Sequence, residues 1–155
     1  MTDLRSFAIN LAREAGQLIV HYRNIESVKR EFKDGLEMVT NADLEADQLI
    51  RKGIAETFPD HLLLSEESSP DLGNLETLDA PVWIVDPIDG TVNYAHGHNH
   101  SAVSIAYSED KQIRIGVVFN PFTNEMWVGE KGKGAFLNGE SIRVAEEKEL
   151  ARAII

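Results

Sequence analysis

Two short acidic segments carry the side chains of this sequence that are best suited to chemistry. Glu66-Glu67 and the run from Asp86 to Thr91 each follow a short apolar stretch, so we expect both where a buried strand gives way to a loop. Carboxylates held close together repel one another unless a cation neutralises them. Hard oxygen ligands of this kind select Mg²⁺ or Mn²⁺ over softer metals. The pattern therefore predicts a divalent-metal site.

The segment that begins at Asp86 adds a second chemical feature. Asp86 and Asp89 are separated by a rigid Pro-containing turn, so both can point at one position, with the carbonyl of Ile88 between them. Gly90-Thr91 opens a short helical turn, whose free backbone N–H groups bind phosphate. The simpler alternative is that the aspartates cap a turn and Glu66-Glu67 is a solvated loop. Gly90-Thr91, together with a second acidic strand end, favours a metal–phosphate site.

Two helices are expected before these segments. Apolar residues recur at helical spacing from Leu4 to Tyr22, and Thr2 is placed to cap that helix. Thr40 begins a second helix, where Asp43 completes a capping-box variant, and Pro59 ends it. The apolar face expected for this second helix consists of Leu44, Ile50, Ile54 and Phe58.

The rest of the chain reads mainly as strands. A charged hairpin turns at Asp34-Gly35, and Leu62–Leu64 forms a short buried strand. Further strands are expected at residues 82–85, 102–107, 113–119, 126–128, 135–137 and 142–144, with Asn138-Gly139 as a hairpin turn. Early helices and late hairpins predict an α+β fold in which two N-terminal helices pack on an antiparallel sheet. Trp83 and Trp127 are expected in its core.

Composition limits the possible partners. The chain has 155 residues, 43% of them hydrophobic, and a formal net charge of −11, so we expect an acidic protein located in the cytoplasm. That charge disfavours nucleic acid and anionic lipid as partners. No apolar stretch is long enough to span a membrane. The absence of cysteine excludes disulfides, thiol nucleophiles and Cys-ligated zinc.

Three histidines in five residues, His96, His98 and His100, raise the alternative of a zinc site, because alternating residues of a strand share a face. The intervening Gly97 and Asn99 favour a polar loop instead.

The run from Trp83 to Asn93, WIVDPIDGTVN, resembles the signature of the inositol monophosphatase family. The family's upstream Gly-Glu-Glu is matched by Ser65-Glu66-Glu67, with Ser65 in place of the usual glycine. The similarity continues through Val39–Asp43 and Gly132–Gly139, so it covers nearly the whole chain. It implies the N-terminal half of a layered α/β/α/β/α sandwich.

The resemblance also implies roles for individual residues. The metal ligands would be Glu66, Asp86, Asp89 and the carbonyl of Ile88. The substrate-binding residues would be Glu66, Ile88, Asp89, Gly90 and Thr91. The catalytic residues would be Asp43, Glu67 and Thr91, of which Thr91 and Asp43 orient the attacking water and Glu67 lies beside the metal ligands.

Members of this family hydrolyse small phosphate monoesters with Mg²⁺, are inhibited by Li⁺ and are usually homodimers. The expected substrate is inositol 1-phosphate, and Mn²⁺ is an alternative cofactor. The alternatives are a phosphatase acting on 3′-phosphoadenosine 5′-phosphate or fructose 1,6-bisphosphate, or a non-catalytic cation-binding fragment. The family's further metal-binding Asp, in a Trp-Asp motif, has no counterpart up to Ile155. We therefore interpret residues 1–150 as an N-terminal metal- and phosphate-binding domain and 151–155 as the start of a C-terminal domain, without which the chain is not expected to be active.

Overall fold

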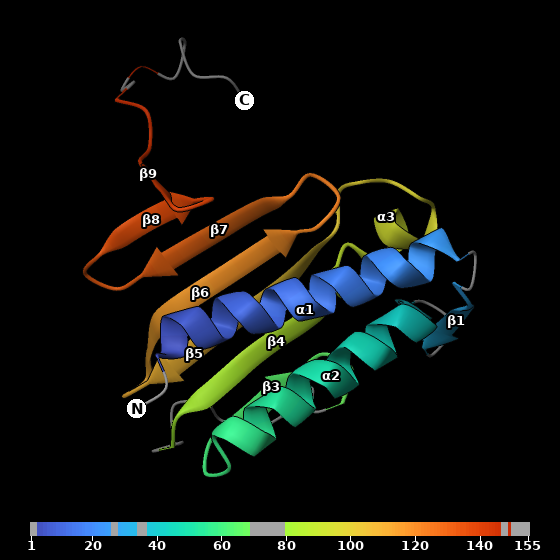
Figure 1. Cartoon of the computed structure of the whole chain (residues 1–155), viewed down its shortest axis with the longest axis horizontal. Helices are drawn as coiled ribbons and strands as arrows, with labels where there is room; N and C mark the ends of the chain where they lie inside the picture. The colour runs from blue at the N-terminus through green and yellow to red at the C-terminus, as the bar shows by residue number, and fades with distance from the viewer. Residues whose placement is uncertain (1–2, 26–27, 34–36, 69–79, 147–148, 150–155) are drawn as a thin grey trace.

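A computed structural model of the chain consists of a helical layer against one face of a seven-stranded sheet, with a separate two-stranded sheet at one end (Figure 1). The structure describes residues 3–25, 28–33, 37–68, 80–146 and 149. The elements are α1 (Leu4–Asn24), β1 (Arg30–Lys33), β2 (Glu37–Thr40), α2 (Asn41–Thr57), β3 (Leu62–Ser65), β4 (Val82–Asp89), α3 (Thr91–Ala95), β5 (Ala102–Glu109), β6 (Gln112–Asn120), β7 (Glu125–Glu130), β8 (Gly134–Leu137) and β9 (Glu140–Ile142).

The long helix α1 begins one residue later than predicted. Its N-cap is Asp3, whose carboxylate accepts hydrogen bonds from the Ser6 backbone N–H at 3.1 Å and from the Ser6 hydroxyl at 2.5 Å. A carboxylate at this position satisfies a free N–H of the first turn, and its charge suits the helix N-terminus. The predicted cap at Thr2 is therefore wrong, and Thr2 itself lies outside the described residues.

The second helix, α2, begins at the predicted capping box. The backbone N–H of Thr40 donates to Asp43 Oδ2 at 2.9 Å, and α2 ends at Thr57, two residues before Pro59. Leu44 does not belong to the buried face, because its residue is 49% exposed. The buried positions of α2 are Ala42, Asp43, Ala46, Asp47, Ile50 and Ile54. This face therefore carries two acids toward the interior of the protein.

The large sheet has the strand order β3-β4-β5-β6-β7-β8-β9, and it is mixed rather than wholly antiparallel. β3 pairs with β4 in parallel, from Leu62 opposite Val82 to Ser65 opposite Val85, whereas every other pair is antiparallel. Sixteen residues separate Ser65 from Val82, which is long enough for the chain to return to the edge of the sheet where β3 begins, as parallel pairing requires. As a result, β3 and β4 direct their carboxyl ends to the same edge.

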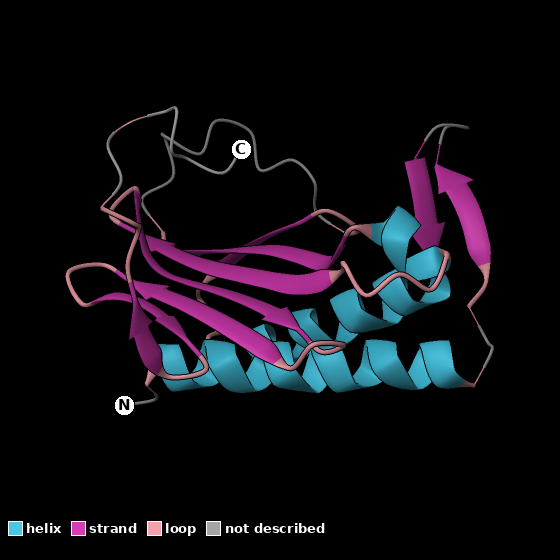
Figure 2. Cartoon of the chain, turned by 90° about the horizontal axis from the view of Figure 1, so that it is seen from above, coloured by secondary structure: helices cyan, strands magenta, loops and turns pink. Residues whose placement is uncertain are grey.

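The core lies between the two long helices and the sheet, which α1 and α2 cover on one face (Figure 2). Trp83 is fully buried there, packed against Phe7 and Phe58, which confirms its predicted core position. Trp127 is only half-buried and borders a surface hollow, so its predicted core position is wrong. None of the described helices combines the length and the apolarity needed to cross a bilayer.

Candidate metal and phosphate site

The predicted site residues come from four elements that meet near one end of the sheet. Asp43 lies in the first turn of α2, and Glu66 directly follows β3. Asp86 and Asp89 lie within β4, and Thr91 is the first residue of α3. The parallel pairing of β3 and β4 brings Glu66 close to Asp86. The backbone N–H of Glu66 donates to the carbonyl of Val85, the residue before Asp86, at 3.2 Å.

A bulge in β4 replaces the turn that the sequence predicts after Val85. The strand continues to Asp89, with Asp86 opposite Ser104 and Asp89 opposite Ala102. Three steps along β4 thus face two steps along β5, so one extra residue is accommodated in β4. A bulge of this kind redirects side chains that a regular pleat would send to opposite faces.

Asp86 is the most perturbed acid of the site. The pKa of Asp86 is raised to about 7, chiefly by burial and next by the neighbouring charge of Glu66. A hydrogen bond with Glu66 and the more distant charges of Asp89 and Asp43 act in the same direction. Asp86 Oδ1 is buried and has no hydrogen-bond partner among the described residues. An acceptor left in this state needs a proton or a cation.

Asp43 is a second buried acid, and its residue is only 1% exposed. Its Oδ2 accepts hydrogen bonds from the backbone and the hydroxyl of Thr40, and its Oδ1 accepts from the Thr91 hydroxyl at 3.0 Å. These bonds favour the charged form, yet burial outweighs them and raises the pKa of Asp43. Its capping role in α2 therefore fixes an acid that also contacts the start of α3.

The Thr91 hydroxyl joins α2 to the bulged strand. Thr91 Oγ1 lies 3.0 Å from Asp43 Oδ1 and also 3.0 Å from the carbonyl oxygen of Ile88. A hydroxyl carries one hydrogen, so it donates to one of these oxygens at a time and keeps its own lone pairs available. The structure thus brings Thr91, Asp43 and the Ile88 carbonyl together, three of the groups that the sequence singles out.

Gly90 has a backbone conformation that would be strained for any other residue. Its φ of +84° is left-handed, and it is the N-cap residue of α3. A Cβ atom here would also lie 2.8 Å from the carbonyl oxygen of His100. Both reasons favour glycine, because it alone lacks the Cβ atom. Next to Asp89 and Gly90 lies an open hollow of about 320 Å³, which Trp127 also borders.

The side chains proposed as metal ligands, by contrast, do not form a closed coordination shell. Across the described ranges, no three His, Asp or Glu side chains are grouped as metal ligands. Glu66 and Asp89 are exposed, and their charges raise the pKa of Asp86. Glu67 follows Glu66 and is half-buried. The carboxyl oxygens and the orphaned Asp86 Oδ1 fit a hard divalent cation in chemistry.

The histidine-rich segment forms the predicted loop. His96, His98 and His100 are all exposed. Arg23 donates to the carbonyl of His98 at 2.8 Å, and Asn93 donates to the carbonyl of His100 at 3.0 Å. These contacts hold the loop by its backbone.

One buried acid beside the site is missed by the sequence reasoning. Asp47 lies one helical turn after Asp43, and it accepts a hydrogen bond from the hydroxyl of Ser65. The spacing of four residues between two acids of one helix is the signal that points to Asp47.

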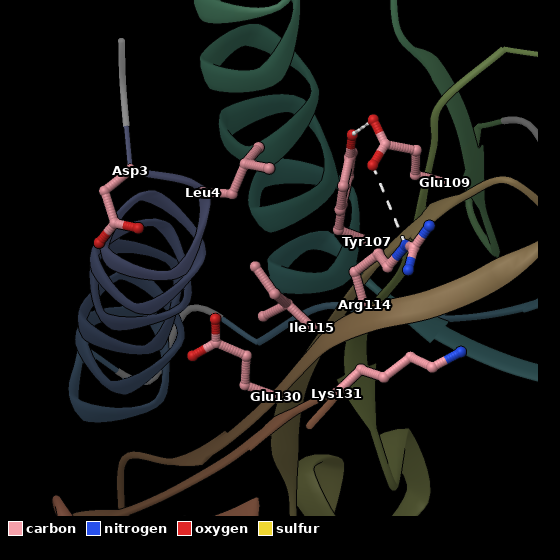
Figure 3. A pocket seen from close by; sticks show the side chains of 8 residues that line it. All are labelled: Asp3, Leu4, Tyr107, Glu109, Arg114, Ile115, Glu130 and Lys131. Atoms are coloured by element: carbon pink, nitrogen blue, oxygen red, sulfur yellow. Dashed lines mark hydrogen bonds and ion pairs between the residues drawn. The ribbon is translucent and has the colours of Figure 1, made fainter. Parts of the chain in front are cut away.

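A larger hollow, about 740 Å³, lies beside the N-terminal end of α1 and is drawn in Figure 3. It also contains acids, but Glu109 there lies 3.9 Å from the Nε atom of Arg114, and Tyr107 donates to Glu109 at 3.2 Å. Its charges are thus of both signs, unlike those around Asp86. This hollow contains none of the residues that the sequence predicts for the site.

Comparison with known proteins identifies the family. The chain matches the profile of the inositol monophosphatase family over residues 1–155. It is 39% identical to inositol monophosphatase 2 of Solanum lycopersicum over 100% of the chain and 58% of that protein. It is 38% identical to a fructose-1,6-bisphosphatase/inositol-1-monophosphatase of Thermotoga maritima, over 98% of the chain and 57% of the relative. The chain therefore belongs to the inositol monophosphatase family, and it spans about half the length of these relatives.

Solved structures show the same fold. An inositol monophosphatase structure from Thermotoga maritima superposes with a TM-score of 0.81 at 40% identity, covering 91% of this chain and 53% of the other. The extragenic suppressor protein suhB of Bartonella henselae superposes with a TM-score of 0.84 at 32% identity, covering 94% and 55%. The predicted α+β class is confirmed, although the sheet is mixed instead of antiparallel as predicted.

Proposed function

We propose that this chain provides the cation- and phosphate-binding part of a Mg²⁺-dependent phosphomonoesterase. The observation that carries the proposal is the buried, unpartnered Oδ1 of Asp86 among the carboxylates of Glu66 and Asp89. Among the described residues, no basic side chain forms an ion pair with any of these three acids. A divalent cation supplies the missing positive charge. Membership of the inositol monophosphatase family supports the same conclusion.

Asp86, Asp89, Glu66 and the Ile88 carbonyl are the groups that would hold the cation. Mg²⁺ is favoured because all of them offer hard oxygen donors, and Mn²⁺ fits the same donors. A cation bound there neutralises charge on the phosphoryl oxygens and makes water a better nucleophile near neutral pH.

Thr91 and Asp43 provide the proton-handling groups of the site. Asp43 accepts from the Thr91 hydroxyl at 3.0 Å, and Asp43 is held in place by Thr40. When Thr91 donates to Asp43, its lone pairs face outward and can accept a hydrogen bond from the attacking water. The pair therefore orients that water, and the half-buried Glu67 adds negative charge close to the cation ligands.

The Gly90-Thr91 turn is the proposed phosphate-binding element. The left-handed Gly90 places the chain so that the first backbone N–H groups of α3 are free of partners within the helix. Phosphate oxygens accept hydrogen bonds from such groups, and the cation balances the remaining charge. The neighbouring hollow of about 320 Å³ has room for the organic part of a small ester.

The proposed substrate is a small sugar or polyol phosphate, with inositol 1-phosphate as the leading candidate. The name of the Thermotoga maritima relative joins this activity to fructose 1,6-bisphosphate hydrolysis, so that ester is the first alternative. 3′-Phosphoadenosine 5′-phosphate is the other ester to compare. Equal rates on all three esters would contradict any named substrate.

The deciding experiment measures phosphate release from inositol 1-phosphate with and without Mg²⁺, beside the Asp89→Asn variant. Release that requires Mg²⁺ and disappears in the variant supports a complete site. Cation binding without release, measured by calorimetry, supports a cation-binding module. That second candidate is favoured by the open donor set and by the chain spanning half the length of its relatives. Binding that is unchanged in Asp89→Asn would contradict both.

A further inference from the structure

We propose that Asp47 is a positioning residue that holds Glu66 in place through Ser65, and this inference rests on the proposed cation site. Asp47 is 4% exposed and Ser65 is fully buried. The Ser65 hydroxyl donates a hydrogen bond to Asp47 Oδ1, so the last residue of β3 is tied to the middle of α2. Glu66 is the next residue in the chain.

The two buried acids of α2 contact different elements of the site. Asp43 and Asp47 are one helical turn apart and lie on the same face of α2. Asp43 contacts Thr91 at the start of α3, whereas Asp47 contacts Ser65 at the end of β3. One rigid helix thus sets the distance between the phosphate-binding turn and the strand end that carries Glu66.

Glu66 needs such a restraint. The charge of Glu66 acts on the neighbouring Asp86, so the two acids repel each other whenever both are ionised. The described backbone contact of Glu66 is the 3.2 Å hydrogen bond to Val85, at the long end of the normal range. The bond from Ser65 to Asp47 adds a charge-assisted anchor one residue away.

A purely structural explanation accounts less well for these residue types. Burying a carboxylate costs free energy, and well-packed apolar residues at both positions would avoid that cost. The acid at 47 and the hydroxyl at 65 are the minimum pair that fixes the strand end by a directional bond. Groups that orient a metal ligand in this way change metal affinity by about 10–100-fold when they are removed.

The first test needs no cation. Hydrogen exchange of the Glu66 amide is measured by NMR in the metal-free chain for Asp47→Ala, Ser65→Ala and Asp47→Asn. Losing a hydrogen bond to a charged group corresponds to roughly tenfold faster exchange, and we expect this in the first two variants. Asp47→Asn keeps an acceptor oxygen and should stay near wild type. Glu45→Ala is the matched control, because it removes one exposed acid from the same helix.

The second test measures Mn²⁺ affinity of the same variants by calorimetry. We expect the dissociation constant to rise by about 10–100-fold in Asp47→Ala and Ser65→Ala, and no further in the double variant, because both act through one bond. Glu45→Ala should change it little.

The outcomes separate this inference from the proposed function. Unchanged exchange at Glu66 in Asp47→Ala overturns the positioning role. Faster exchange with unchanged Mn²⁺ affinity also overturns it, because Glu66 would then not need its anchor. If the wild-type chain binds no Mn²⁺ while exchange accelerates as expected, the cation site fails and the anchoring of Glu66 by Asp47 stands.

Discussion

The hollow drawn in Figure 3 lies beside the N-terminal end of α1, whereas α3, next to the acids around Asp86, lies toward the other end of that helix (Figure 1). The acids of these two regions differ in how their charges are balanced. At the N-terminal end of the helix, Arg114 pairs with Asp110 at 2.7 Å, and Lys133 pairs with Glu130 at 2.6 Å. Near the other end, Asp86 has other acids as its charged neighbours. Among the described residues, Asp86 therefore lacks the basic partners that balance the acids at the N-terminal end of α1.

The same contrast appears in the direction of two pKa shifts. Hydrogen bonds from the Ser6 hydroxyl and backbone lower the pKa of Asp3, the exposed cap of α1. Burial and the charge of Glu66 raise the pKa of Asp86 to about 7. The residue type is the same, so the environment alone decides whether the carboxylate stabilises the fold by itself.

The largest expected effect comes from Asp86→Asn. We expect Mn²⁺ affinity to fall by more than about a hundredfold, since losing a ligand costs more than losing one of its supporting partners, about 10–100-fold. Glu109→Gln, at the balanced end, is the control and should leave the affinity unchanged. Calorimetric titration of both variants checks the difference. Equal losses in the two would show that the overall charge, rather than the site, attracts the cation.

The next effect is a pH dependence of stability in the metal-free chain. The folded state holds a proton on Asp86 up to about pH 7, whereas the unfolded chain releases it near the ordinary value of 3.8. The contribution of Asp86 to the free energy of unfolding is therefore fully present below about pH 3.8 and is lost as the pH rises to about 7. We expect a loss on the order of 2 kcal/mol, allowing for solvent screening of this half-buried group.

Urea unfolding between pH 4 and 8 measures this loss. In Asp86→Asn the slope over that range should flatten, and Mn²⁺ at pH 7.5 should restore stability to the wild-type chain. A wild-type stability that rises steadily over the same range would contradict the raised pKa of Asp86.

A smaller effect of opposite sign is expected at Asp3. Because its pKa is lowered on folding, its contribution is present above the ordinary pKa and is lost as the pH falls through the folded value. Asp3→Ala should therefore lower the melting temperature at pH 7 and matter less near pH 3. Thermal scans at both pH values make the comparison, with Asp3→Asn, which keeps a capping oxygen, as the control.

The smallest effect is expected for Arg114→Gln. Its partners Glu109 and Asp110 are exposed, and exposed ion pairs contribute about 0–1 kcal/mol. The free energy of unfolding in urea should change within that range, less still in high salt. A loss above about 2 kcal/mol would mean that the balanced end also depends strongly on its charges.

Local signals in the sequence were sufficient for most elements of the fold. The capping box of Thr40 and Asp43 lies within four consecutive residues, so it can be recognised from the sequence alone. Short apolar runs bounded by turn residues predicted the strands, but the end of β4 was misplaced because Pro87 in an irregular strand resembles a turn residue. The error at Leu44 has a similar origin, since a spacing of six residues does not return to the same helix face.

The acids of the site, the glycine of its turn and the family were all readable from neighbouring residues, because ligand type and backbone freedom are properties of single positions and short runs. The parallel pairing of β3 with β4, the bulge at Asp86 and the bond from Ser65 to Asp47 were not. Each depends on segments distant in the chain, and the pKa of Asp86 depends on which charges the fold places around it. Burial and proximity are properties of the folded chain, so only the tertiary structure decided that Asp86 is partly buried beside the charge of Glu66.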